Sequence, residues 1–158
     1  MKTVIRWLEQ HRAEAVAQII ERVCEQLPDY RQRPMDQLTA TAGAAYDQWC
    51  ATVLENDLLR HAREAEAVIA QNVAQGTNPS QLSRIPALIC AVVVSMLAQA
   101  GPEVDPAERA LFQEQAEHMT ATILGLGGLR IAQAVLKKAV KESVLPPPRP
   151  RRRPEESG

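Results

Sequence analysis

The amino-acid sequence predicts an all-α fold. Aromatic residues make up only 3% of the 158 residues, whereas alanine, leucine, glutamine, arginine and glutamate, which favour helices, are abundant. Apolar residues recur at helical spacing, and no segment alternates apolar and polar residues long enough to require a strand. With 46% hydrophobic against 23% charged residues, the chain can bury a core. We therefore expect a single compact bundle of about five helices.

The first helix is expected over residues 3–27, where seven apolar residues recur at helical spacing with charges between them. Pro28 ends it, because proline cannot continue a helix and disfavours helix in the residue before it. The segment from Pro28 to Pro34 is therefore predicted to be a short connector.

A second helix is predicted over residues 35–53, with Trp49 as the bulky anchor of its apolar face. Asn56 and Asp57 indicate a break, because Asp57 is able to cap a third helix over residues 58–73. One continuous bent helix is the alternative interpretation of these two segments.

The fourth helix has the clearest start, because Asn78 supplies a capping side chain and Pro79 fits the first helical position. It runs to about Ala100 and is apolar on more than one face, which predicts that it is the central, most buried helix. Residues 85–102 carry no charge, but prolines and polar residues interrupt them, so we expect a core helix and no membrane span.

The last helix is expected to be long and to end at about Val144. It should begin at Asp105–Pro106, where a capping residue is again followed by a proline at the first helical position. The proline- and arginine-rich residues 146–158 lack apolar periodicity, and we expect a disordered tail or linker there. Residues 1–145 are therefore interpreted as one helical sensory or interaction domain.

The formal net charge is −1, which gives no electrostatic reason to expect nucleic acid as a partner. The tail carries a net charge of +2 and residues 1–145 carry −3. Its arginines could contact phosphates, acidic lipids or an acidic protein, while a solvated tail is the alternative. The candidate contact residues are Arg149, Arg151, Arg152 and Arg153.

The three cysteines are widely spaced and odd in number, which favours small buried hydrophobic residues over disulfides or a zinc site. Arg6, Glu9 and Arg12 interrupt the apolar stretch that a signal peptide needs, so we expect a cytoplasmic protein. Both observations favour a reducing compartment.

No motif for a nucleophile, a phosphate loop or a metal site is present, so we expect no enzymatic activity, no catalytic residue, no metal and no cofactor. His11, His61 and His118 fall on three separate predicted helices. His61 or His118 as a haem ligand is the alternative to an ordinary solvated or hydrogen-bonded histidine.

Small residues form a stripe at 4-3-4 spacing in the middle of the last helix: Ala121, Gly125, Gly128 and Ala132. Each glycine costs about 1 kcal/mol relative to alanine in a helix, so close packing should offset that cost. Packing within the chain, a dimer contact and a ligand void are the three interpretations. The same glycines could instead mark a kink in the helix.

Three segments carry a family resemblance: Glu25–Tyr30 at the end of the first helix, Asp36–Leu38 at the start of the second, and Asn72–Gly76 before the fourth. Over about residues 3–142 the chain resembles the N-terminal domain of RsbRD-type RsbT co-antagonist proteins. The resemblance implies a helical sensory or dimerising input domain, in that family commonly followed by a STAS output domain of the bacterial stressosome. The phosphorylatable residues of that family belong to the STAS domain, so the resemblance assigns none of them to this sequence.

The leading hypothesis is therefore a non-catalytic bacterial signalling module that binds a protein partner or forms a homodimer. One alternative is a helical sensor that binds a small apolar ligand or haem between the fourth and last helices. A second alternative is an adaptor whose basic tail binds an acidic partner. The sequence leaves these three open.

Overall fold

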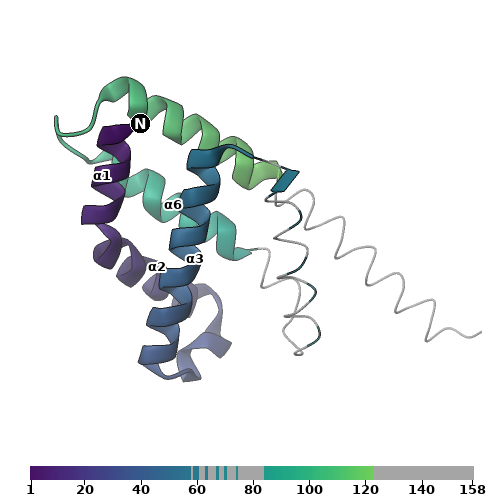
Figure 1. The fold of residues 1–158 in the computed structure, drawn as a ribbon. Helices are drawn as coiled ribbons and strands as arrows, with labels where there is room; N and C mark the ends of the chain where they lie inside the picture. Colours follow the sequence, from purple (N-terminus) through teal and green to yellow (C-terminus); the bar gives the residue numbers. More distant parts are fainter. Residues whose placement is uncertain are drawn as a thin grey trace, which may run out of the picture.

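The computed structural model describes residues 1–57, 59, 60, 63, 67, 70, 74 and 84–122. Every regular element in this part of the chain is helical, which confirms the all-α prediction for it (Figure 1). The elements are α1 (Lys2–Gln10), α2 (Arg12–Gln26), the 3-10 helix η1 (Pro28–Gln32), α3 (Met35–Glu55), α6 (Arg84–Ala98) and a helix over residues 106–122.

The first predicted helix is divided in two, so the expectation of one continuous helix over residues 3–27 was wrong. The break lies at His11, whose φ of −104° and ψ of 12° leave the helical region. The imidazole of His11 stacks on the indole of Trp7, and its Nδ1 lies 2.9 Å from the Trp7 carbonyl oxygen. A side chain that folds back onto the backbone in this way competes with regular helix geometry, and α2 starts in a new direction (Figure 1).

The predicted break after the second helix is confirmed. Asn56 adopts the left-handed conformation, with a φ of 52°, and ends α3. The backbone N–H of Arg60 then donates to Oδ1 of Asp57 over 3.1 Å, which is the predicted capping contact. The connector from Pro28 is more regular than expected, because it forms η1.

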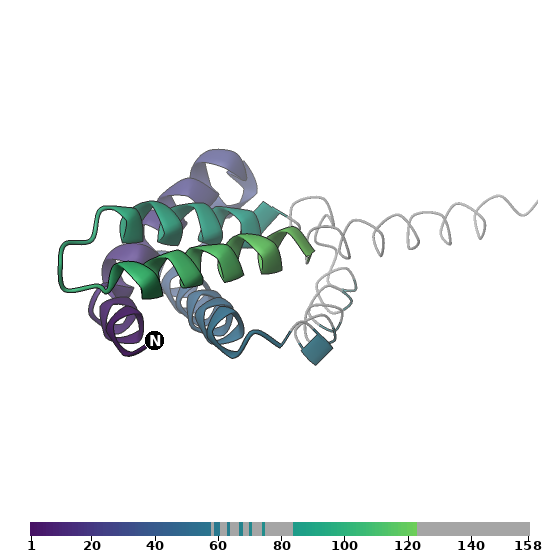
Figure 2. The same cartoon turned by 90° about the horizontal axis from the view of Figure 1, so that it is seen from above.

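The second cap predicted from a residue pair, Asp105–Pro106, is also confirmed. Oδ1 of Asp105 accepts the backbone N–H groups of Ala107 and Glu108 over 2.8 and 3.2 Å. The helix that begins there lies beside α6 in an antiparallel arrangement (Figures 1 and 2).

The core is built where α2 packs against both α3 and α6. Seven of the fifteen residues of α6 are buried, against four of fifteen in α2, which fits the expectation of a strongly buried fourth helix. Phe112 is fully buried and meets the ring of Trp49 edge-on, with 6.1 Å between the centroids. This pair joins α3 to the helix over residues 106–122, and Trp49 is the anchor that the sequence predicted.

A glycine in α3 makes room for an ion pair with α2. The guanidinium of Arg12 donates to both carboxylate oxygens of Asp47 over 2.8 and 2.9 Å. A Cβ at Gly43, one turn before Asp47, would lie 2.7 Å from this guanidinium. The missing side chain therefore lets Arg12 lie across α3.

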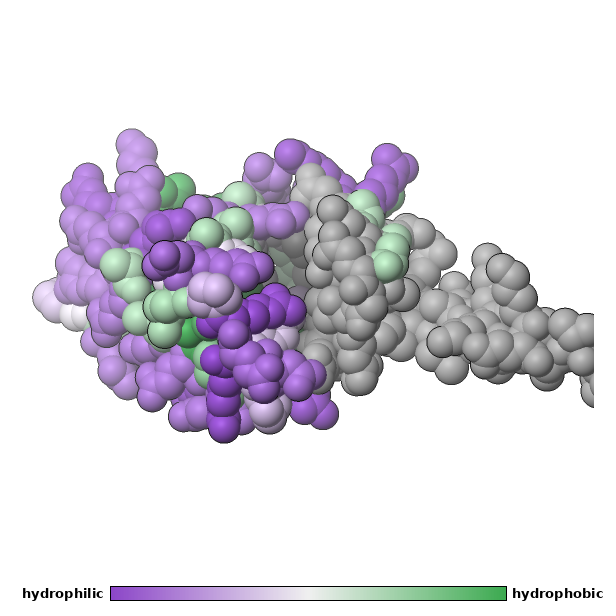
Figure 3. Space-filling model, turned by 90° about the horizontal axis from the view of Figure 1, so that it is seen from below, coloured by the Kyte–Doolittle hydropathy of each residue, from purple (hydrophilic) through white to green (hydrophobic). Residues whose placement is uncertain are grey.

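Among the described helices, none has the length and hydropathy that crossing a membrane requires. On the face drawn in Figure 3, hydrophilic residues surround small apolar patches. The predicted helix start at Asn78–Pro79, the last helix beyond residue 122 and the tail over 146–158 lie outside the described residues.

Candidate functional site

A polar groove of about 300 Å³ lies between the α1–α2 junction and the C-terminal end of α6. We call it the polar groove, and its lining residues are Trp7, His11, Glu14, Gln18, Ser95, Met96, Gln99, Ala100 and Glu103. Its volume is at the lower end of the range for small-ligand sites, and the polar lining suits a ligand with charge or hydrogen-bonding groups.

An aromatic stack forms one wall of the polar groove. The rings of Trp7 and His11 are 4.4 Å apart and inclined by 19°. Trp7 is 4% exposed, while His11 is half-buried. Because Nδ1 of His11 is held by the Trp7 carbonyl, the orientation of the imidazole is fixed before any ligand arrives.

Two carboxylates face solvent at the polar groove, Glu14 from α2 and Glu103 from the loop after α6. Glu103 accepts the backbone N–H of Gly101 over 3.1 Å, and neither carboxylate forms an ion pair with a described residue. No lysine or arginine lines the groove. The fixed charge at this site is therefore negative.

Arg12, which follows His11 in the chain, and Arg109, which contacts Ala100, are both engaged by other partners. Arg12 is held by Asp47, and the pKa of that carboxyl lies below its ordinary value because it accepts the guanidinium hydrogen bonds. Arg109 donates to the carbonyls of Ala100 and Gly101 over 2.9 and 3.2 Å, at the end of α6. It therefore complements the negative end of the α6 dipole.

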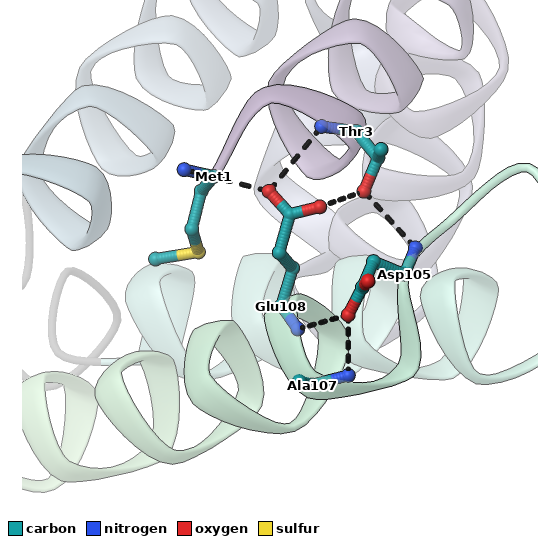
Figure 4. A network of polar contacts seen from close by, with 5 residues as sticks. All are labelled: Met1, Thr3, Asp105, Ala107 and Glu108. Atoms are coloured by element: carbon teal, nitrogen blue, oxygen red, sulfur yellow. Dashed lines mark hydrogen bonds and ion pairs between the residues drawn. The ribbon is translucent and has the colours of Figure 1, made fainter.

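A second polar cluster joins the N-terminal ends of α1 and the helix over residues 106–122 (Figure 4). The Thr3 hydroxyl accepts the backbone N–H of Asp105 over 3.0 Å and donates to Oε2 of Glu108. Oε1 of Glu108 accepts the Thr3 N–H over 3.3 Å and lies 3.4 Å from the Met1 amino group. The Thr3 hydroxyl and both carboxylate oxygens of Glu108 have partners within this cluster, so we interpret it as a structural contact between the two helices.

The cysteines behave largely as the sequence predicted. Cys50 and Cys90 are buried and Cys24 is half-buried, all as free thiols. Burial raises the pKa of the Cys50 thiol to about 12 and also raises the pKa of Cys90. Two of the three are therefore poor nucleophiles in the folded chain.

The structure describes only one residue of the predicted stripe, Ala121, which is exposed. His61 lies outside the described residues. So do the other stripe residues and the tail arginines, which are Gly125, Gly128, Ala132, Arg149, Arg151, Arg152 and Arg153. His118 is exposed, and His11 is the hydrogen-bonded histidine of the groove. In the described part of the chain, no cluster of three or more residues suited to a metal ion is found.

Sequence reasoning did not find the polar groove. Glu14 and Glu103 are far apart in the chain, and each has the polar neighbours typical of a solvated helix or loop. The one available signal was the four-residue spacing of Trp7 and His11, which places their rings on one helix face. No protein-family model, curated protein or solved structure matches the chain.

Proposed function

We propose that the chain is a non-catalytic signalling domain of a cytoplasmic bacterial protein, an input module that works by forming a homodimer. The resemblance of the sequence to the N-terminal domain of RsbRD-type proteins supports this role. The observation that carries the proposal is an exposed face on the helix over residues 106–122.

That face contains Leu111, Glu114, His118 and Ala121, which follow one another at 3-4-3 spacing and are all exposed. Leu111 is 45% exposed although it is a large apolar residue. The opposite face is buried, through Phe112, Ala116 and Met119. This helix therefore covers the core with one side and leaves a second side available.

The exposed positions have the spacing of a helix-pairing seam. In the sequence, the same alternation of three and four residues continues from Ala121 to Gly125, Gly128 and Ala132. A seam of this spacing meets a second helix along its whole length, and small side chains allow the two backbones to approach closely. The exposure of Ala121 favours a contact with another molecule over packing within the chain.

Sedimentation velocity over a wide range of protein concentration tests the dimer. We expect a concentration-dependent dimer for the wild-type chain. Ala121→Leu should shift the equilibrium towards the monomer, because the larger side chain separates the helices. Gly125→Leu and Gly128→Leu should act in the same direction.

Ala17→Leu is the matched control, because Ala17 is an exposed alanine on α2, away from the proposed seam. It should leave the dimer unchanged. If Gly125→Leu and Gly128→Leu both keep the wild-type mass and melting temperature, the stripe has no role. A wild-type chain that stays monomeric at every concentration contradicts the homodimer.

A further inference from the structure

The helix over residues 106–122 lies at the edge of the molecule, and one of its sides is uncovered. Phe112 is buried on its inner side, whereas no described element packs over the opposite side (Figures 1 and 2). The proposed dimer seam occupies that outer side, and its described members are Leu111, Glu114, His118 and Ala121. These four residues differ in size and charge, so the direction in which a second copy packs matters.

Twofold symmetry allows two helices of the same sequence to pair in a parallel or an antiparallel direction. In a parallel pair each seam residue faces its own counterpart, so Glu114 meets a second Glu114 and His118 a second His118. In an antiparallel pair, residues equally distant from the twofold axis face one another. Leu111 and Ala121 lie five residues before and after Ala116. Glu114 and His118 lie two residues before and after it.

An antiparallel pair with its axis level with Ala116 matches the four described seam members in both size and charge. The large side chain of Leu111 then packs against the small Ala121, and the carboxylate of Glu114 faces the imidazole of His118. Symmetry repeats both pairs. An axis displaced by half of the seven-residue repeat loses the match, because it puts Leu111 against Glu114, or His118 against Ala121.

The charged groups around His118 favour its protonation in this pair. Neither Glu114 nor His118 forms an ion pair with a described residue of its own chain. Glu117 is exposed beside the seam and lies near the axis, close to its counterpart. The neighbouring helix α6 contributes Arg84 at its first residue and the buried thiol of Cys90. Carboxylates therefore outnumber the imidazoles at the paired seam, and positive charge on the imidazoles lowers their repulsion.

We propose that two copies of the chain pair through the helix over residues 106–122 in an antiparallel direction, with the twofold axis level with Ala116. Glu114 of each copy pairs with the protonated His118 of the other copy. Histidine gains its charge as the pH falls from about 8 to about 5, so acidification over this range strengthens the dimer. This arrangement rests on the proposed function, to which it adds a direction and a response to pH.

Sedimentation velocity at about pH 7.5 and about pH 5.8, at low ionic strength, tests the response to pH. We expect the dissociation constant of the dimer to fall about tenfold on acidification, because two ion pairs form in each dimer. His118→Gln should abolish this change. His11→Gln, a matched change at a histidine outside the seam, should keep it. A wild-type dimer that weakens on acidification, or a full response in His118→Gln, would overturn the proposal.

An exchange of the two charges tests the direction. At about pH 5.8, Glu114→Lys and His118→Glu should each weaken the dimer about tenfold, because each change alone places like charges opposite one another. The double variant should restore the dimer and lose the response to pH, since each new lysine then faces a new glutamate. In a parallel dimer the double variant would stay weak. Glu21→Lys, at an exposed position of α2, is the control for added positive charge and should leave the dimer unchanged.

Cysteine cross-linking identifies the residues that face one another. Leu111→Cys and Ala121→Cys are each made together with Cys24→Ser, because Cys24 is half-buried whereas the other two cysteines are buried. When the two variants are mixed and oxidised, they should form a disulfide with each other. Each variant alone should form almost none, because its new thiols lie at opposite ends of the paired seam.

The outcomes separate the direction from the dimer itself. A Leu111→Cys variant that cross-links to its own copy, or a dimer that gives no mixed product, would overturn the antiparallel direction and leave the homodimer standing. A wild-type chain that is monomeric at every concentration and at both pH values would overturn both. Circular dichroism of each variant establishes that it is folded.

Discussion

The hydroxyl of Thr3 lies inside the capping box of a helix that begins more than a hundred residues later. In an ordinary capping box the glutamate at the third helical position accepts the N–H of the capping residue. Here the Asp105 N–H donates to Thr3 instead, and Thr3 donates to Glu108, so the threonine links the two halves of the box. Helix capping thereby becomes a tertiary contact between α1 and the helix over residues 106–122.

Removing this hydroxyl should destabilise the fold. We expect Thr3→Val to lower the free energy of unfolding by about 1 kcal/mol, since two hydrogen bonds are lost at a partly buried position. Thr3→Ser should recover most of the loss. Thr39→Val is the control, because that hydroxyl donates only to the Met35 carbonyl within its own helix. Urea denaturation measures all three, and equal losses for Thr3→Val and Thr39→Val would contradict the bridging role.

The same cluster predicts a pH dependence. The hydrogen bond from Thr3 holds the pKa of Glu108 below its ordinary value in the folded chain. A carboxyl with a lowered folded pKa stabilises the fold above its unfolded pKa, and this contribution is lost as the pH falls through the folded pKa. Between about pH 5 and pH 3, the stability of Glu108→Gln should therefore fall less steeply than that of the wild type. Glu21→Gln, a change at an exposed position of α2 outside the proposed seam, should keep the wild-type slope.

Tyr46 should stabilise the break between α1 and α2. Its buried hydroxyl donates to the Leu8 carbonyl over 2.8 Å, close to the residue where the helix is interrupted. Tyr46→Phe leaves this carbonyl without that donor and should cost about 1 to 2 kcal/mol. Tyr30→Phe is the control, because Tyr30 is buried and its hydroxyl has no hydrogen bond to a described residue. Thermal unfolding that ranks the two variants equally would contradict this assignment.

The adjacent residues Leu111 and Phe112 should respond very differently to truncation. Phe112 is fully buried against Trp49, so Phe112→Ala should cost about 3 to 5 kcal/mol or prevent folding. Leu111 is 45% exposed, and Leu111→Ala should cost less than about 1 kcal/mol. Chemical denaturation measures the loss in the free energy of unfolding for each variant. A similar loss for both would mean that this helix turns a different set of residues towards the core.

Thiol labelling should report the burial of the cysteines. In the native chain we expect Ellman's reagent to react first with Cys24, because burial raises the pKa values of Cys50 and Cys90 and limits access to them. Cys24→Ser should remove the fast phase and leave the slow one. All three thiols should react rapidly in denaturant, and a fast phase that persists in Cys24→Ser would contradict the burial assignment.

Local chemistry explains which parts of the fold were predictable. Asp57 and Asp105 cap helices through contacts to residues two or three positions away, so the relevant atoms are adjacent in the sequence. Trp49 could be chosen as a core anchor from the apolar periodicity of its helix. The break at His11 was missed, because Leu8 and Val16 keep the same helical phase across it, whereas the backbone dihedral angles of His11 and its ring stack on Trp7 are visible only in the folded chain.

The helical class, the caps at Asp57 and Asp105 and the apolar faces of the described helices could be predicted from the sequence, because they depend on neighbouring residues and on a period of 3.6 residues per turn. That Glu14 and Glu103 line the same groove, and that Thr3 enters the capping box of Glu108, becomes visible in the folded chain alone. Such pairings depend on how helices distant in the chain cross and rotate against one another. Packing energies of the whole core set that geometry, and no local pattern encodes it.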